Sequence, residues 1–303
     1  MTWTRQKERG STAALRLMAW IVTRMGYGVG FALLWPIAGY FFVTSPLQRR
    51  AMRRFQRRAR GRAPTTREVF QPFLVFAATI LDRLFLLDGQ RTGYDLRIEG
   101  LDLLNERIAR GGGCILLGAH IGSFNAMHAV ADTGCPVEVV SLMHTQNATK
   151  SAEFFAEWGA RHGRNPQTET VIPLGQPDAM LRAAEALGRG GLVGILADRT
   201  PGTDKVVRLP FLGEDAAFPL GPHILAGVLG APVMMAFGVW TGKRRYEVHF
   251  VPFAERIALD RRERQAQLEA VARDYAARLE RIARRYPDNW FNFFDFWDEM
   301  DAR

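Results

Sequence analysis

The fold and function of this chain are best interpreted from one segment, Cys114-Ile115-Leu116-Leu117-Gly118-Ala119-His120-Ile121-Gly122-Ser123-Phe124-Asn125. Its first half is a short apolar run that predicts a buried β-strand, and Gly118 loosens the end of that strand. His120 follows, and Gly122-Ser123 opens a predicted helix over 124–130 with Ser123 near its N-cap. Open α/β sheets place their ligands at such strand ends. His120 is therefore the first candidate catalytic residue, and the helix N-terminus could stabilise a developing negative charge.

Predicted strands and helices alternate along the rest of the chain. The strand-like runs cover 96–99, 114–118, 137–142, 192–197, 232–239 and 246–251. The helix-like runs cover 68–88, 101–110, 148–162, 178–187, 221–229 and 268–286. This alternation predicts an α/β fold with a mixed, largely parallel sheet flanked by helices.

The N-terminal region contains an apolar run from Met25 to Val43 without a charged residue, bounded by Arg24. A helix that crosses a membrane needs about 20 such residues. No small-residue cleavage pattern follows, so a cleaved signal peptide is not expected. The run predicts a hydrophobic helical membrane anchor, spanning or half-inserted, although a buried amphipathic pair of helices has the same pattern.

An arginine cluster follows the apolar run. Its members, with no acid between them, are Arg49, Arg50, Arg53, Arg54, Arg57, Arg58, Arg60, Arg62 and Arg67. Such a cluster is typical of a cytoplasmic segment held by anionic headgroups, each charge contributing ~1 kcal/mol. A solvated helix face is an alternative; nucleic-acid binding is disfavoured because no DNA or RNA motif accompanies the cluster. We therefore predict a membrane anchor and basic segment over 1–67 and an α/β domain over 68–303.

The block from His120 to Asn125 resembles the active-site block of the glycerolipid acyltransferases, in which four residues separate a histidine from Asp or Glu. Later segments narrow the resemblance to the lipid A secondary (lauroyl/myristoyl-type) acyltransferases. These segments are Ala197-Asp198-Arg199-Thr200-Pro201-Gly202, Leu209–Gly213, Ala216–Gly221 and Tyr286-Pro287-Asp288-Asn289-Trp290-Phe291. The likeness runs from about residue 95 to the end of the chain.

The resemblance implies a membrane-bound transferase at an inner membrane of bacterial type, with the catalytic domain in the cytoplasm. It would move an acyl chain from acyl carrier protein or coenzyme A to a hydroxyl of a lipid or glycolipid. His120 would be the general base, because the unperturbed pKa of histidine lies near the working pH. Neither a covalent acyl-enzyme nor a cofactor is implied. Net charge +9 fits an anionic membrane and an acidic carrier protein.

The six histidines show no H-x3-H or H-E-x-x-H spacing, so no metal site is predicted. Cys114 and Cys135 lie in apolar surroundings, and we interpret both as reduced core residues.

Asn125 departs from the family pattern, because an amide stands where the family has a carboxylate. An amide can hold the tautomer of a histidine but supplies no charge, and the Asp-to-Asn exchange in a Ser-His-Asp triad costs about 10⁴ in turnover. Asp198, at the end of a predicted core strand, is a candidate substitute, or else a turn cap. Asn125 also keeps open a second hypothesis, a catalytically silent relative that binds lipid or scaffolds a membrane complex.

The remaining candidates are substrate contacts. Arg199 could bind a phosphate or polarise the thioester carbonyl, or else form a surface ion pair. His144 and Asn147 follow the predicted strand over 137–142, where the resemblance implies acceptor-binding polar residues. Phe211 and Phe218 could line an acyl channel, although core packing explains them as well.

Overall fold

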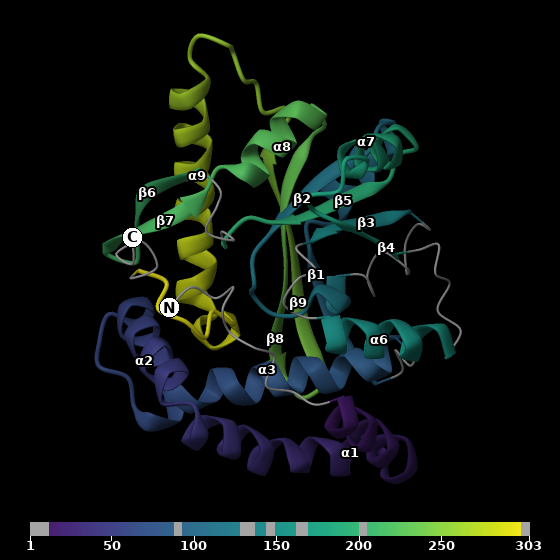
Figure 1. Ribbon diagram of the computed structural model, residues 1–303, viewed down its shortest axis with the longest axis vertical. Helices are drawn as coiled ribbons and strands as arrows, with labels where there is room; N and C mark the ends of the chain where they lie inside the picture. Colours follow the sequence, from purple (N-terminus) through teal and green to yellow (C-terminus); the bar gives the residue numbers. More distant parts are fainter. Residues whose placement is uncertain are drawn as a thin grey trace.

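The structure is a computed structural model that describes residues 12–87, 93–127, 137–143, 149–161, 169–199 and 205–297. Its centre is a seven-stranded sheet with the order β1-β9-β8-β2-β5-β3-β4 (Figure 1). The strands are β1 (Asp95–Glu99), β2 (Cys114–Gly118), β3 (Val139–Met143), β4 (Glu169–Pro173), β5 (Leu192–Leu196), β8 (Val233–Gly242) and β9 (Arg245–Ala254). Every neighbouring pair is parallel except the antiparallel hairpin of β8 and β9. The predicted mixed, largely parallel sheet is therefore confirmed.

Helices cover both faces of this sheet (Figure 1). One apolar cluster takes in α7 (Ala179–Gly188), α8 (Gly221–Leu229) and α9 (Arg264–Arg285), and the other takes in α4 (Leu101–Ala109). In β2, Ile115 and Leu117 belong to the first cluster, whereas Cys114 and Leu116 belong to the second. A strand buried on both faces reads as a continuous apolar run, which explains the sequence of this segment.

A separate two-stranded hairpin, β6 (Val206–Phe211) and β7 (Glu214–Pro219), packs through β6 against α9. After α9, a single turn of 3₁₀-helix, η2 (Pro287–Asn289), leads into the C-terminal segment. The helix α6 (Thr149–Arg161) packs against the N-terminal helices α1 and α3.

Three N-terminal helices lie beneath the sheet: α1 (Thr12–Thr44), α2 (Pro46–Arg60) and α3 (Thr66–Leu87) (Figure 1). Gly26, with φ +83°, interrupts α1. Both α1 and α3 are long and apolar enough to cross a membrane, although α3 is largely buried within the protein. The long apolar N-terminal helix is thus a candidate anchor.

The helix α2 packs on the C-terminal segment. The ring of Phe55 lies 4.6 Å from that of Trp290, and the Gln56 side-chain amide donates to the carbonyl of Pro287 at 3.0 Å. Residues before 67 therefore share the core of the α/β body, and the division of the chain at residue 67 stays a prediction.

Cys114 is fully buried, and burial raises the pKa of its thiol to about 12. Such a thiol is unreactive at neutral pH. Cys135 lies outside the described residues.

Candidate active site

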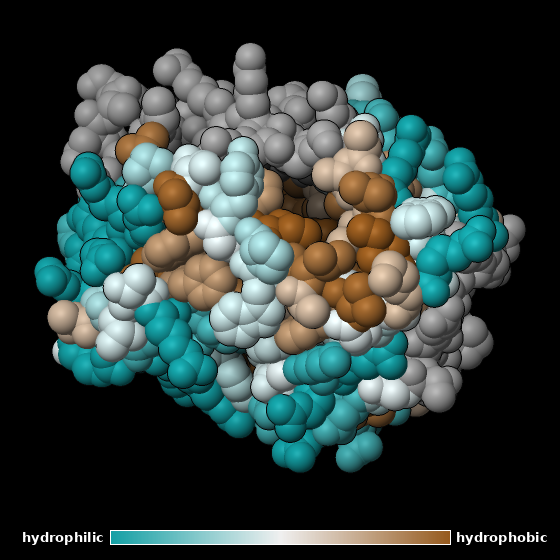
Figure 2. All heavy atoms as spheres, turned by 90° about the horizontal axis from the view of Figure 1, so that it is seen from below, coloured by the Kyte–Doolittle hydropathy of each residue, from teal (hydrophilic) through white to brown (hydrophobic). Residues whose placement is uncertain are grey.

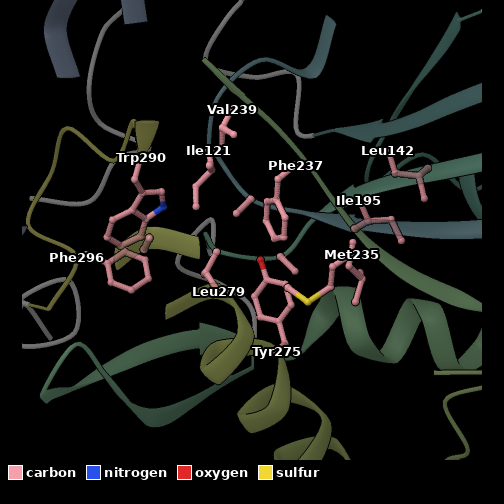
Figure 3. Packing of buried hydrophobic residues seen from close by; sticks show 14 of the residues in the cluster. Ile121, Leu142, Ile195, Met235, Phe237, Val239, Tyr275, Leu279, Trp290 and Phe296 are labelled. Carbon is pink, nitrogen blue, oxygen red and sulfur yellow. The ribbon is translucent and has the colours of Figure 1, made fainter. Parts of the chain in front are cut away.

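His120 lies two residues beyond the end of β2, at the edge of the sheet where β5 also ends. These parallel neighbours pair Gly118 with Leu196, so the chain leaves both strands at the same place. The carbonyl of Gly118 is held there by the N–H of Ala197 (3.0 Å) and by the hydroxyl of Tyr275 (2.8 Å). In Figure 3 the side chain of Tyr275 points from α9 toward the sheet. His120 thus occupies a strand-end position, as the apolar run predicted.

Asp198 is the hydrogen-bonding partner of His120. Its Oδ1 lies 2.7 Å from Nδ1 of the imidazole, and its Oδ2 accepts the backbone N–H of His120 at 3.1 Å. The carboxylate is completely buried, whereas the imidazole is 30% exposed. Because an ionised carboxylate can only accept hydrogen bonds, Nδ1 carries the proton and Nε2 keeps its lone pair.

The C-terminal segment completes the surroundings of Asp198. Oδ2 also accepts the indole N–H of Trp290 at 3.1 Å and the side-chain amide of Asn292 at 3.2 Å. The guanidinium of Arg199 donates to Oδ1 of Asn292 at 2.5 Å and to the carbonyl of Phe291 at 2.8 Å. Both Asp198 and the groups that bind it are therefore fixed by contacts between distant parts of the sequence.

The surroundings also set the charges of the pair. Burial, followed by the charge of Arg199, holds the pKa of His120 below its usual value, against the opposing effect of Asp198. Burial alone would raise the pKa of Asp198, but the charge and hydrogen bond of His120, then Arg199 and Trp290, outweigh it and lower that pKa. At neutral pH the pair is therefore a carboxylate beside a neutral imidazole, which is the state a general base needs.

Close backbone contact fixes the segment after His120. Gly122 has φ +67°, and a Cβ there would lie 2.0 Å from the carbonyl oxygen of Gly238. The N–H of Gly122 donates to the carbonyl of Asn289 (2.8 Å), and that of Ser123 donates to Gly238 (2.6 Å). Only glycine fits at position 122, because a side chain would collide with β8.

The start of the helix after His120 agrees in part with the prediction. The Ser123 hydroxyl accepts the N–H of Ala126 at 3.3 Å, so Ser123 caps this helix as predicted. The N–H groups of Gly122 and Ser123 already have partners and are not free to bind an oxyanion. Ile121 forms an isolated antiparallel bridge with Trp290, and the two side chains lie near each other in Figure 3.

Comparison with known proteins agrees with this architecture. The family model of bacterial lipid A biosynthesis acyltransferases matches residues 73–298, about three-quarters of the chain. The chain belongs to the bacterial lipid A biosynthesis acyltransferase family. No curated protein matches it. The resemblance found in the sequence is thus confirmed, and acyl transfer in lipid biosynthesis is the activity of the family.

In this member of the lipid A acyltransferase family, Asn125, which stands where the resemblance implies an acidic residue, is half-buried. Within the described part of the chain, no hydrogen bond joins Asn125 to His120, and Nδ1 of the imidazole is bound to Asp198 instead. The hydrogen bond to the imidazole that the resemblance implies for residue 125 is made by Asp198 in this structure.

The other predicted contacts are placed as follows. Arg199 is half-buried and contacts the C-terminal segment, with its guanidinium bound to Asn292 and 5.5 Å from the ring of Phe294. Phe211 and Phe218 are fully buried and contact each other edge to face at 5.4 Å. Their role as an acyl channel stays a prediction. His144 and Asn147 lie outside the described residues.

Two residues of the site were missed by sequence reasoning. Trp290 belongs to the closing motif of the resemblance, but nothing in the sequence connects its indole N–H with Asp198. Asn292 carries no signal at all, since an isolated amide two residues after a tryptophan has no pattern to identify it. Among the residues that the structure describes, no group of three His, Cys, Asp or Glu side chains could hold a metal ion.

Proposed function

We propose that the protein transfers an acyl chain from a thioester of acyl carrier protein or coenzyme A to a hydroxyl group of a lipid or glycolipid. His120 acts as the general base and Asp198 as its charged partner. The hydrogen bond between Nδ1 of His120 and Oδ1 of Asp198 is the single observation that supports this proposal best.

The chemistry needs no covalent enzyme intermediate. Nε2 of His120 removes the proton from the acceptor hydroxyl while that oxygen attacks the carbonyl carbon of the thioester. The tetrahedral intermediate collapses, the carbon–sulfur bond breaks, and the thiolate takes the proton back from Nε2. Asp198 stabilises the imidazolium that exists between the two proton transfers, as the aspartate of a Ser-His-Asp triad does.

The position of Asp198 favours an active enzyme over the catalytically silent alternative that Asn125 raises. A carboxylate contributes the charge that an amide lacks, and Asp198 contacts the imidazole directly. Arg199 then acts mainly by holding the C-terminal segment and by keeping His120 neutral, with binding of an anionic substrate group as a further role. His144 and Asn147 as acceptor contacts, and Phe211 and Phe218 as acyl-channel residues, remain part of the proposal.

Association with an anionic bacterial inner membrane, with the catalytic part in the cytoplasm, belongs to the same proposal. The apolar helix α1 and the arginine-rich helix α2 support it. The lipid acceptor would then reach His120 without leaving the membrane.

The experiment is an acyl-transfer assay with purified protein, a radiolabelled acyl carrier protein or coenzyme A donor, and a bacterial lipid extract as acceptor. Wild type should form a labelled lipid, and His120→Ala should not. Circular dichroism spectra of the two proteins should be the same, which shows that the variant is folded. Wild-type turnover in His120→Ala would refute the assignment of the base. Absence of transfer by wild type from either donor would favour the lipid-binding, non-catalytic protein.

A further inference from the structure

The helix α1 has two unlike sides. Along one side, Ala19, Val22, Tyr27, Leu34 and Ala38 are buried against the protein. The opposite side exposes large apolar residues, each at least about one-third accessible: Leu17, Trp20, Met25, Trp35, Ile37, Tyr40 and Val43. A helix that crossed a bilayer apart from the rest of its protein would be surrounded by lipid. The buried side of α1 shows that the helix instead packs against the protein along its length.

A buried carboxylate holds α1 to the body of the protein. Asp82 of α3 accepts the hydroxyl groups of Tyr27 of α1 (2.8 Å), Tyr94 (2.8 Å) and Tyr246 of β9 (2.6 Å). Removing α1 would leave this buried carboxylate short of one donor, which is costly. The guanidinium of Arg244, in the turn before β9, also lies 4.1 Å from the ring of Tyr27.

This attachment argues against α1 crossing the membrane. In Figure 1, α1 lies lengthwise under α3 and α6. Glu157 of α6 lies 3.9 Å from Arg16 of α1 and 3.5 Å from Arg161. If α1 were perpendicular to the membrane, these charged side chains would enter the hydrocarbon region together with it. Gly26 also divides the helix, so the uninterrupted part from Tyr27 to Thr44 is at the short end of the range for a spanning helix.

The exposed apolar side continues into a basic strip on α2. Leu47 is exposed, and Arg50, Arg53 and Arg57 follow it at steps of three and four residues, all exposed. In the described part of the chain no acid pairs with these three arginines, whereas Arg54 binds Asp295 and Glu214 of the body. Figure 2 shows the apolar underside bordered by hydrophilic residues and hollowed near its middle.

The same face approaches the catalytic residue. Phe76 of α3 is 41% exposed, and its ring lies 5.2 Å from that of Phe291. The N–H of Phe291 in turn donates to the carbonyl of His120 at 2.9 Å. Only two residues, Phe76 and Phe291, would therefore separate a lipid in contact with Phe76 from the backbone of His120.

We propose that the protein is monotopic: α1 lies in the plane of the membrane, with its apolar side in one leaflet of an anionic bilayer. Arg50, Arg53 and Arg57 bind the headgroups of that leaflet, so both ends of α1 and the catalytic body stay on one side. The inference rests on the proposed function only in that the membrane supplies the lipid acceptor.

Topology is tested with an epitope tag at each terminus of the full chain in a bacterial host. Protease added to spheroplasts should leave both tags intact, and protease added to inverted membrane vesicles should remove both. Cleavage of the N-terminal tag alone in spheroplasts would show that α1 crosses the membrane and would overturn the inference. This readout does not depend on acyl transfer, so inactive protein with both tags on one side would refute only the proposed catalysis.

The leaflet contact is tested by binding of purified protein to phosphatidylglycerol-containing vesicles. Arg50→Glu/Arg53→Glu/Arg57→Glu should bind about 100-fold or more weakly than wild type, at ~1 kcal/mol per charge. The matched control is Arg261→Glu/Arg262→Glu/Arg264→Glu, an equal charge change in exposed residues around the start of α9, far from α1 in Figure 1. Equal weakening in both triple variants, or none in either, would overturn the assignment of the face.

Discussion

The indole N–H of Trp290 donates to Oδ2 of Asp198 at 3.1 Å, although the two residues are 92 positions apart in the sequence. Oδ2 also accepts the backbone N–H of His120 and the amide of Asn292, while Oδ1 faces the imidazole. One buried carboxylate thus fixes the strand end, the C-terminal segment and the tautomer of the proposed base.

Asp198→Asn should reduce acyl-transfer turnover by about 10³ to 10⁴, because the imidazolium loses its negatively charged partner. Asn125→Glu should change turnover little, or lower it by adding a second carboxylate to a site that already has one. Both variants are compared with wild type in one assay with the same donor. A large gain in Asn125→Glu together with normal turnover in Asp198→Asn would assign the charged partner to position 125.

Arg199→Gln should move the acid limb of the pH–rate profile to higher pH. Arg199 is one of the two causes that lower the pKa of His120, so its loss raises that pKa. The base must be neutral to work, and in wild type the rate therefore falls only at pH below the usual histidine value of about 6.5. The profile of kcat/KM measures the shift. Arg189→Gln is the control, since Arg189 pairs with Glu138 away from the site, and an unmoved limb in Arg199→Gln would contradict the proposed effect.

Trp290→Phe keeps an aromatic ring in the core but removes the N–H that Asp198 accepts. We expect a loss of about 1–2 kcal/mol in unfolding free energy and a fall of about tenfold in kcat. Trp297→Phe is matched in size and also removes a buried N–H donor, in this case to the carbonyl of Phe211. This variant should lose similar stability but keep the wild-type kcat, so equal effects of both variants on kcat would show that Trp290 has no positioning role.

Gly122→Ala should destabilise the protein by more than the ~1–2 kcal/mol of a left-handed residue, because its Cβ would also collide with Gly238. Gly175→Ala is the control: Gly175 has φ +97°, but a Cβ there meets nothing within 4 Å. Thermal unfolding of the two variants separates backbone strain from collision. Equal melting temperatures would show that the segment after His120 can move away from β8.

Membrane attachment should resist high salt and yield to detergent, because the apolar side of α1 supplies binding that counterions do not screen. Fractionation of cells that express the full chain, followed by salt and detergent washes, measures this. Recovery of intact protein in the soluble fraction without detergent would contradict the proposed membrane association.

The sequence by itself determined the strands with strong apolar patterns and the place of His120. The run from Cys114 to Gly118 predicted a buried strand, and β2 is such a strand, with apolar neighbours on both faces. The hairpin of β6 and β7 was not predicted, because Pro210, Gly213 and Pro219 interrupt its alternation. The strand β4 was missed because only two of its five residues, Val171 and Ile172, are apolar, so it has neither an apolar run nor a regular alternation.

Only the tertiary structure decided which carboxylate serves His120. The parallel pairing of β2 with β5 joins Gly118 to Leu196, and His120 and Asp198 each follow two residues later. The order of strands in a sheet depends on crossover connections and packing between distant segments, and local residue preferences do not specify it. For the same reason the sequence could identify α1 as apolar, whereas only its packing on α3 revealed that one side faces the protein and the other lies exposed.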